Sequence, residues 1–257
     1  MIIDARTYVG EAEPQIADPP LELDGHSPER ILSLMEKADI DKSIIIPRHC
    51  SDFNKANEKV AKIVETYPDK FIGFGRVNPN CTECAFDAAR NAIKNLGLKG
   101  LEVSYFAWKW YDPVIAVPLF RRLFELDAPI LIRADIDKGL VRYSLDQIAT
   151  LSFRRPIIVA VSWDMCAGFT MPPYRDELLE IAQSNDNIFI ETSGNEVMIL
   201  ERLVSKIGVH RLIFGSNSPP REPISEKAKI EAMRITEDEK KLILGENILR
   251  ILEGRWR

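Results

Sequence analysis

The sequence predicts a single-domain α/β fold, a (β/α)8 barrel, on three observations. The chain has 257 residues with 46% hydrophobic content, and barrels of this class commonly have about 250 residues. Short runs rich in β-branched residues alternate with amphipathic segments along the whole chain, which favours parallel strands. The runs are apolar almost throughout, as expected of strands that are covered on both faces.

Eight runs have the composition of buried strands. They are Met1–Asp4, Ser43–Ile46, Phe71–Phe74, Leu98–Val103, Ile130–Arg133, Ile157–Val161, Ile188–Glu191 and Leu212–Phe214. An open, doubly wound sheet is the alternative arrangement of such strands. No Gly-x-Gly-x-x-Gly follows any of the runs, so the nucleotide-binding form of that alternative is poorly supported.

Amphipathic helices are expected between the strands. Ser27 and Pro28 begin the first one, as N-cap and first-turn proline. The others are expected at Phe53–Thr66, Thr82–Asn95, Ile115–Leu126, Ser144–Leu151, Tyr174–Ser184 and Glu196–Lys206. C-terminal helices are expected from about residue 224, with a capping box at Thr236–Glu239. One domain over residues 1–257 accounts for all of these elements.

The net charge is −5 and the isoelectric point is near 5.4, which argues against nucleic acid or an anionic membrane as the main partner. No stretch is long and apolar enough to span a bilayer, and no basic segment leads into an apolar signal region at the N-terminus. We therefore expect a cytoplasmic protein whose partner is a small molecule.

Function in such a barrel lies where strands end and loops begin. The chemically interesting residues at these positions are Arg6, Tyr8, Arg48, His49, Arg76, Arg133, Asp164 and Asn217. Four of them are arginines, and guanidinium groups bind carboxylate or phosphate with paired hydrogen bonds. The pattern predicts a small anionic ligand.

A series of motifs recurs in order along the chain. They are IIDARTYVG at residues 2–10, YPDKFIGF at 67–74, LKGLEV at 98–103, PILIR at 129–133, PIIVAV at 156–161, NIFIETSG at 187–194, RLIFGSNSP at 211–219 and LGEN at 244–247. In these motifs the whole chain resembles the amidohydrolase-related family, in the branch that includes aminocarboxymuconate semialdehyde decarboxylase. The resemblance implies a (β/α)8 barrel and a nominal hydrolase.

The resemblance also implies a metal site. In the family, the metal is held by His-x-His at the end of the first strand, a His after the fifth, often a His after the sixth, and an Asp after the eighth. The matching positions here are Arg6 and Tyr8, Arg133, Val161 and Asn217. A guanidinium group repels a divalent cation, and an amide cannot deprotonate water. We therefore predict that the metal centre is lost and that no cofactor is bound.

Two interpretations of these replacements stay open. In one, Arg6 and Arg133 pair with acids such as Glu102, Asp135, Asp164 or Glu191 and keep an inactive pocket folded. In the other, Arg6, Arg48, Arg76 and Arg133 bind the anion, and Tyr8 and Asn217 assist. The protein is then a non-catalytic binder, or a metal-independent hydrolase, lactonase or decarboxylase of a small carboxylate, with Tyr8, His49 or Asp164 in proton transfer.

Cys81 and Cys84 form a Cys-x-x-Cys at the start of the third expected helix, and His49 and Cys50 follow the second strand. A relocated metal site is conceivable there, although the second cysteine pair of a structural zinc site is missing and cysteines often pack as small apolar residues. The aromatic run at residues 104–111 predicts a pocket lid or a subunit contact, and the latter would make the protein a homo-oligomer.

Overall fold

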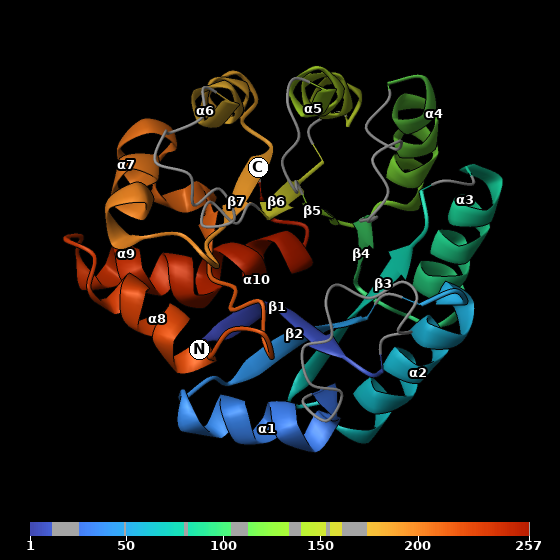
Figure 1. The fold of residues 1–257 in the computed structure, drawn as a ribbon, viewed down its shortest axis with the longest axis horizontal. Helices are drawn as coiled ribbons and strands as arrows, with labels where there is room; N and C mark the ends of the chain where they lie inside the picture. Colours follow the sequence, from blue (N-terminus) through green and yellow to red (C-terminus); the bar gives the residue numbers. More distant parts are fainter. Residues whose placement is uncertain are drawn as a thin grey trace.

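Eight parallel strands form one sheet in which each strand pairs with the next along the chain (Figure 1). This computed structural model describes residues 1–11, 26–48, 50–79, 82–103, 113–133, 140–152, 155–160 and 174–256. Within these ranges only the backbone is described at residues 113–116, 133, 140–144 and 174–177. The strands are β1 (Ile3–Val9), β2 (Lys42–Pro47), β3 (Phe71–Val77), β4 (Gly100–Val103), β5 (Ile130–Arg133), β6 (Ile157–Ala160), β7 (Ile188–Glu191) and β8 (Leu212–Ile213).

The sheet closes on itself because the segment that contains β8 and the residues after it returns to β1. Ala5 N–H donates to the carbonyl of Phe214 at 2.9 Å, and Tyr8 N–H donates to the carbonyl of Ser218 at 2.8 Å. Thr7 and Ser218 form an isolated parallel bridge. The predicted (β/α)8 barrel is therefore confirmed.

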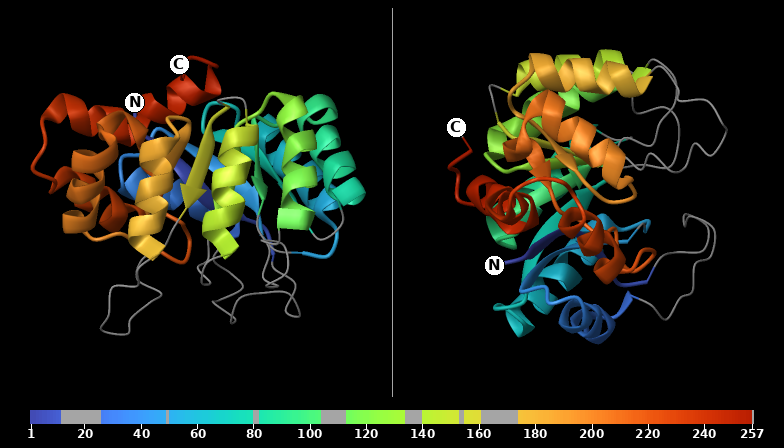
Figure 2. Two further views of the ribbon diagram at one scale, coloured as in Figure 1. Left: turned by 90° about the horizontal axis from the view of Figure 1, so that it is seen from above. Right: turned by 90° about the vertical axis from the view of Figure 1, so that its left-hand side faces the viewer.

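Helices surround the barrel (Figures 1 and 2). They are α1 (Pro28–Lys37), α2 (Phe53–Thr66), α3 (Thr82–Arg90), α4 (Pro113–Leu123), α5 (Leu140–Leu151), α6 (Tyr174–Ser184), α7 (Val197–Ile207), α8 (Pro223–Glu231), α9 (Glu237–Lys241) and α10 (Asn247–Leu252), with short turns η2 (Asn91–Asn95), η3 (Phe124–Leu126), η5 (Val209–Arg211) and η6 (Leu242–Glu246). None of the helices in the described ranges has the length and apolar character needed to cross a bilayer.

The predicted helix signals are present. The side chain of Ser27 caps α1 by accepting from Arg30 N–H, and Pro28 is in the first turn. Thr236 and Glu239 form the predicted capping box of α9. Helices α2 and α6, like β5 and β7, begin and end where they were predicted.

Several predicted strand boundaries were wrong, and two of these errors affect the site. β1 continues to Val9 instead of ending at Asp4, and β3 continues to Val77 instead of Phe74. Arg6, Tyr8 and Arg76 therefore lie inside strands, not after them. The reason is that polar residues interrupt the apolar runs, but the strands continue because these side chains find partners inside the barrel.

The barrel interior is a second core, separate from the layer between sheet and helices. It contains strand residues such as Ile44, Phe74 and Ile158 together with Ile248 and Ile251 of α10. Helix α10 thus covers the end of the barrel at which the strands begin, and both chain termini lie at that end (Figure 2). The opposite end, where the strands finish, is the end at which functional residues are expected in a barrel of this kind.

A bulge in β1 reverses which side chains point inward. Asp4 pairs with Ser43 and Thr7 with Ile45, so three residue steps in β1 face two steps in β2. Ile3 and Ala5 belong to the interior core before the bulge, and Tyr8 belongs to it after the bulge. Regular alternation from Ala5 would have placed Tyr8 on the outer face of the strand.

We expect Gly100→Ala to destabilise the barrel, because the ring of Phe74 lies directly over this glycine. A Cβ atom on Gly100 would be 2.4 Å from Cζ of Phe74, and overpacking of this kind costs about 1–3 kcal/mol. Urea denaturation measures the loss. The loss should be smaller in a Phe74→Leu background, where the ring is absent, and an equal loss in both backgrounds would contradict the packing argument.

Candidate functional site

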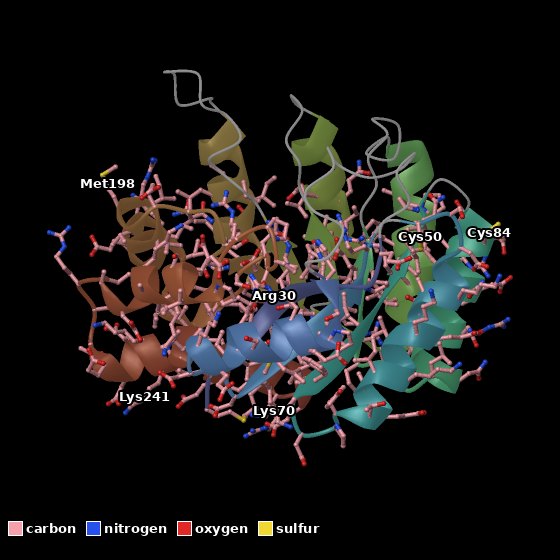
Figure 3. All side chains as sticks on the ribbon, turned by 60° about the horizontal axis from the view of Figure 1, so that its bottom comes forward. Arg30, Cys50, Lys70, Cys84, Met198 and Lys241 are labelled. Atoms are coloured by element: carbon pink, nitrogen blue, oxygen red, sulfur yellow. The ribbon has the colours of Figure 1, made fainter. Side chains whose placement is uncertain are left out.

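Five polar side chains from four strands meet in the barrel interior near the ends at which the strands finish. They are Arg6 and Tyr8 of β1, Arg76 of β3, Glu102 of β4 and Glu191 of β7. All five are buried, with at most 6% of each side chain exposed. In Figure 3, Cys50 and Cys84, which follow β2 and β3, mark this end of the barrel, whereas Lys70, which precedes β3, marks the other end.

We call these five side chains the polar layer. Arg6 and Glu191 form the first ion pair of this layer. Nη1 of Arg6 lies 2.7 Å from Oε2 of Glu191 and 3.3 Å from Oγ of Ser193. The carboxylate also accepts from Ser193 N–H at 2.6 Å and from its hydroxyl at 2.9 Å. Burial alone lowers the pKa of Arg6, but Tyr8, Glu191 and Glu102 raise it above its ordinary value, so this guanidinium stays charged.

Gly215, which follows β8, makes room for this carboxylate. A Cβ atom at Gly215 would lie 2.4 Å from Oε1 of Glu191. Any larger residue would therefore push the carboxylate away from Arg6. The absence of a side chain at residue 215 therefore leaves the space that Glu191 of β7 needs for its ion pair with Arg6.

Arg76 and Glu102 form the second ion pair, and Tyr8 connects it to the first. Nη2 of Arg76 lies 2.7 Å from Oε1 of Glu102. The Tyr8 hydroxyl accepts from Nε of Arg6 at 3.0 Å and donates to the same Oε1 of Glu102 at 3.3 Å. The guanidinium carbons of Arg76 and Arg6 lie 4.9 and 5.6 Å from the centre of the Tyr8 ring, within the range of cation–π attraction.

The two arginines differ in how many of their donors are used. Arg6 donates through Nε and Nη1 to three side chains. Nε and Nη1 of Arg76 have no hydrogen-bond partner in the described part of the chain, although only 1% of the side chain is exposed. Buried donors without partners are costly and uncommon, so these N–H groups are suited to receive a ligand.

Asp4 is a buried carboxyl that the sequence interpretation did not assign to the site. It accepts from the backbone N–H groups of Ser216 at 2.8 Å and Arg6 at 3.1 Å, and from the hydroxyls of Thr7 and Ser216. Burial raises its pKa to about 6, although the four hydrogen bonds act in the opposite direction.

The described residues of this layer do not fit a divalent metal ion. Both carboxylates are already paired with guanidinium groups, which carry positive charge and no free lone pair. Across the described ranges, no three His, Cys, Asp or Glu side chains are grouped as metal ligands. Cys84 is disulfide-bonded and so cannot act as a thiolate ligand, and Cys81 lies outside the described residues.

The structure brings some of the predicted site residues together. Arg6, Tyr8 and Arg76 are brought together, and the predicted pairing of Arg6 with an acid is present in its contact with Glu191. Asn217 contacts β1 through its backbone, because its N–H donates to the carbonyl of Arg6 at 2.9 Å. Only the backbone of Arg133 is described, at the end of β5.

The remaining predicted residues are Arg48, His49 and Asp164. Arg48 is half-buried just after β2. It lies near His26, whose pKa is lowered to about 4 first by burial and then by the charge of Arg48. His49 and Asp164 lie outside the described residues. The roles predicted for them stay predictions.

Comparison with known proteins identifies the relatives of this chain. The family model described as Amidohydrolase matches residues 3–254. A curated relative, 2-amino-3-carboxymuconate-6-semialdehyde decarboxylase of Dictyostelium discoideum, is 32% identical over 77 residues, which is 30% of this chain but only 21% of that protein.

Solved structures share the fold. A TIM-barrel protein of Bordetella bronchiseptica has a TM-score of 0.76 and 18% identity, with 100% of this chain and 99% of that chain covered. The 5-carboxyvanillate decarboxylase of Novosphingobium aromaticivorans, solved with manganese and 4-hydroxy-3-methoxy-5-nitrobenzoic acid, has a TM-score of 0.71, 18% identity and coverage of 98% and 96%. The 2,6-dihydroxybenzoate decarboxylase of Rhizobium has a TM-score of 0.69, 15% identity and coverage of 98% of both chains.

We expect Arg6→Met to lower the free energy of unfolding by about 3–5 kcal/mol, because it leaves the carboxylate of Glu191 buried without its cation. Replacing both partners, in Arg6→Met with Glu191→Gln, should recover most of this loss, since no uncompensated charge remains. Chemical denaturation of the two single variants and the double variant measures the coupling. A loss below about 1 kcal/mol for Arg6→Met, as for an ordinary surface substitution, would contradict the assignment.

The stability of the protein should depend on the ionisation of Asp4. Its pKa is about 6 in the folded state against 3.8 ordinarily, so the folded state holds this proton more tightly than the unfolded chain does. The contribution of Asp4 is greatest below pH 4 and falls by about 3 kcal/mol in all as the pH rises through about 6.

Other groups also titrate in this range, so the measurement is the difference in unfolding free energy between the wild type and Asp4→Asn. From pH 4 to pH 7 the wild type should lose stability relative to the variant. A constant difference, or a relative gain by the wild type, would show that burial does not dominate the ionisation of this carboxyl.

Proposed function

Because the chain belongs to the amidohydrolase family, we propose that it binds a small organic carboxylate inside the barrel mouth, with arginine in place of a metal ion as the source of positive charge. The observation that carries this proposal is the buried guanidinium of Arg76. Its Nε and Nη1 groups have no partner among the described residues, and a carboxylate supplies the oxygen acceptors that they lack.

The chemical class of the ligand is supported by the relatives. Related structures contain small aromatic carboxylates, 2,6-dihydroxybenzoate in one and 4-hydroxy-3-methoxy-5-nitrobenzoic acid in another. Arg76 lies in the interior core between the ring of Tyr8 and the carboxylate of Glu102. An anion that reaches Arg76 is therefore removed from water, which strengthens its interaction with the guanidinium group.

The loss of the metal centre is part of this proposal. Arg6 already supplies a fixed positive charge to Glu191 and Tyr8, and a divalent ion beside it would be repelled. The protein would then bind its ligand in the presence of a strong chelator. Binding of phosphate instead of carboxylate is an alternative that the same guanidinium chemistry allows.

A second candidate function is metal-independent decarboxylation or hydrolysis, including lactone hydrolysis, of a small substrate that carries a carboxylate. It is supported by the hydroxyl of Tyr8, which accepts from Arg6 and donates to Glu102 and so can hold or pass on a proton. In a decarboxylation, the electron pair left on carbon when carbon dioxide departs takes up such a proton. Tyr8→Phe should then abolish turnover in chelator while leaving ligand binding within a few-fold of wild type.

The binding proposal predicts that 2,6-dihydroxybenzoate or benzoate raises the thermal midpoint of the chelator-treated wild type. A ligand at 100 times its Kd stabilises the folded state by about 2.7 kcal/mol. Arg76→Lys keeps a charge for Glu102 but removes the spare N–H groups. Because a hydrogen bond to a charged group contributes about 1.5–3 kcal/mol, this variant should bind roughly tenfold to a hundredfold more weakly in titration calorimetry.

Arg155→Lys is the matched control, because Arg155 pairs with Asp127 near the opposite end of the barrel. It should bind as the wild type does. Three results would overturn the proposal: no midpoint shift with carboxylate or phosphate, equal affinity of Arg76→Lys and wild type, or binding that chelator abolishes.

A further inference from the structure

The inward direction of Arg6 and Tyr8 depends on the bulge in β1, and a bulge leaves backbone groups without their usual partners in the sheet. Arg6 lies within the shifted segment between Asp4 and Thr7. Its N–H donates to Oδ1 of Asp4, at 3.1 Å. The carboxylate of Asp4 therefore satisfies a buried backbone donor that the bulge creates.

The same carboxylate joins the bulge to the segment after β8. Oδ1 of Asp4 accepts from Ser216 N–H at 2.8 Å, and Oδ2 accepts from the Ser216 hydroxyl. Two backbone bonds continue this attachment along β1, from Asn217 N–H to the carbonyl of Arg6 and from Tyr8 N–H to the carbonyl of Ser218. The shifted register is thus held from one side by Asp4 and the residues that follow β8.

We propose that Asp4 is a positioning residue, which sets the bulge of β1 and so aims Arg6 at Glu191. Asp4 is 1% exposed, and its described contacts are to the backbone of Arg6 and Ser216 and to two hydroxyls, not to a charged side chain. It acts through the backbone. This inference does not rest on the proposed ligand, because the ion pair that it assembles is present without one.

Double-mutant cycles between Asp4 and Arg6 test the inference without any ligand. The measured quantity is the fall in urea midpoint that Arg6→Met causes in three backgrounds: wild type, Asp4→Asn and Asp4→Ala. In wild type the fall should be large. In Asp4→Asn it should persist, since the amide oxygen can still accept from the N–H groups of Arg6 and Ser216. In Asp4→Ala it should disappear, because Arg6 is no longer directed at Glu191.

If Asp4 stabilises the fold without directing Arg6, the result is different. Asp4→Ala then lowers the urea midpoint but leaves the effect of Arg6→Met unchanged. That result would overturn the inference. If Asp4→Ala does not fold, Asp4→Ser replaces it, because a serine side chain is too short to reach the N–H groups of both Arg6 and Ser216. The same outcomes apply to it. Thr7→Val is the matched control. It removes one donor to Asp4 but neither backbone contact, so the effect of Arg6→Met should stay as in wild type.

Discussion

Buried positive charge is the constraint from which the interior of this barrel follows. Two guanidinium groups lie in the core, at 1% and 2% exposure, where desolvation costs several kcal/mol for each ion unless a partner and further hydrogen bonds offset it. Glu191 and Glu102 supply the opposite charges at 2.7 Å. Tyr8 links the two pairs, so the four charges form one network spanning β1, β3, β4 and β7.

The network also limits what its neighbours can be. Gly215 has to lack a side chain because the carboxylate of Glu191 occupies the space where a Cβ atom would lie. Ser193, just after β7, turns its backbone N–H and hydroxyl toward the same carboxylate. One ion pair therefore constrains residues in or just after β7, β8 and β1.

Local signals in the sequence predicted most of the fold, whereas the site depended on contacts that are distant in sequence. The caps at Ser27 and Thr236 were predictable because a cap involves residues three positions apart. The partner of Arg6 lies 185 residues away, so a list of acids could include Glu191 but could not select it. Which side chains of β1 point into the barrel was not predictable either. The bulge that decides this depends on the contact of Asp4 with Ser216, 212 residues away.

The two arginines of the network differ in how many of their hydrogen-bond donors are used, and the proposed function depends on this difference. Arg6 and Glu191 satisfy each other with help from Ser193 and Tyr8, so an anion gains little from approaching them. Arg76 donates through Nη2 to Glu102, whereas its Nε and Nη1 groups have no partner among the described residues. Four arginines near strand ends looked equivalent in the sequence. Burial and pairing distinguish Arg6 from Arg76. In the proposed function the anion binds to Arg76, whose charge is paired with Glu102 but whose Nε and Nη1 groups have no partner among the described residues.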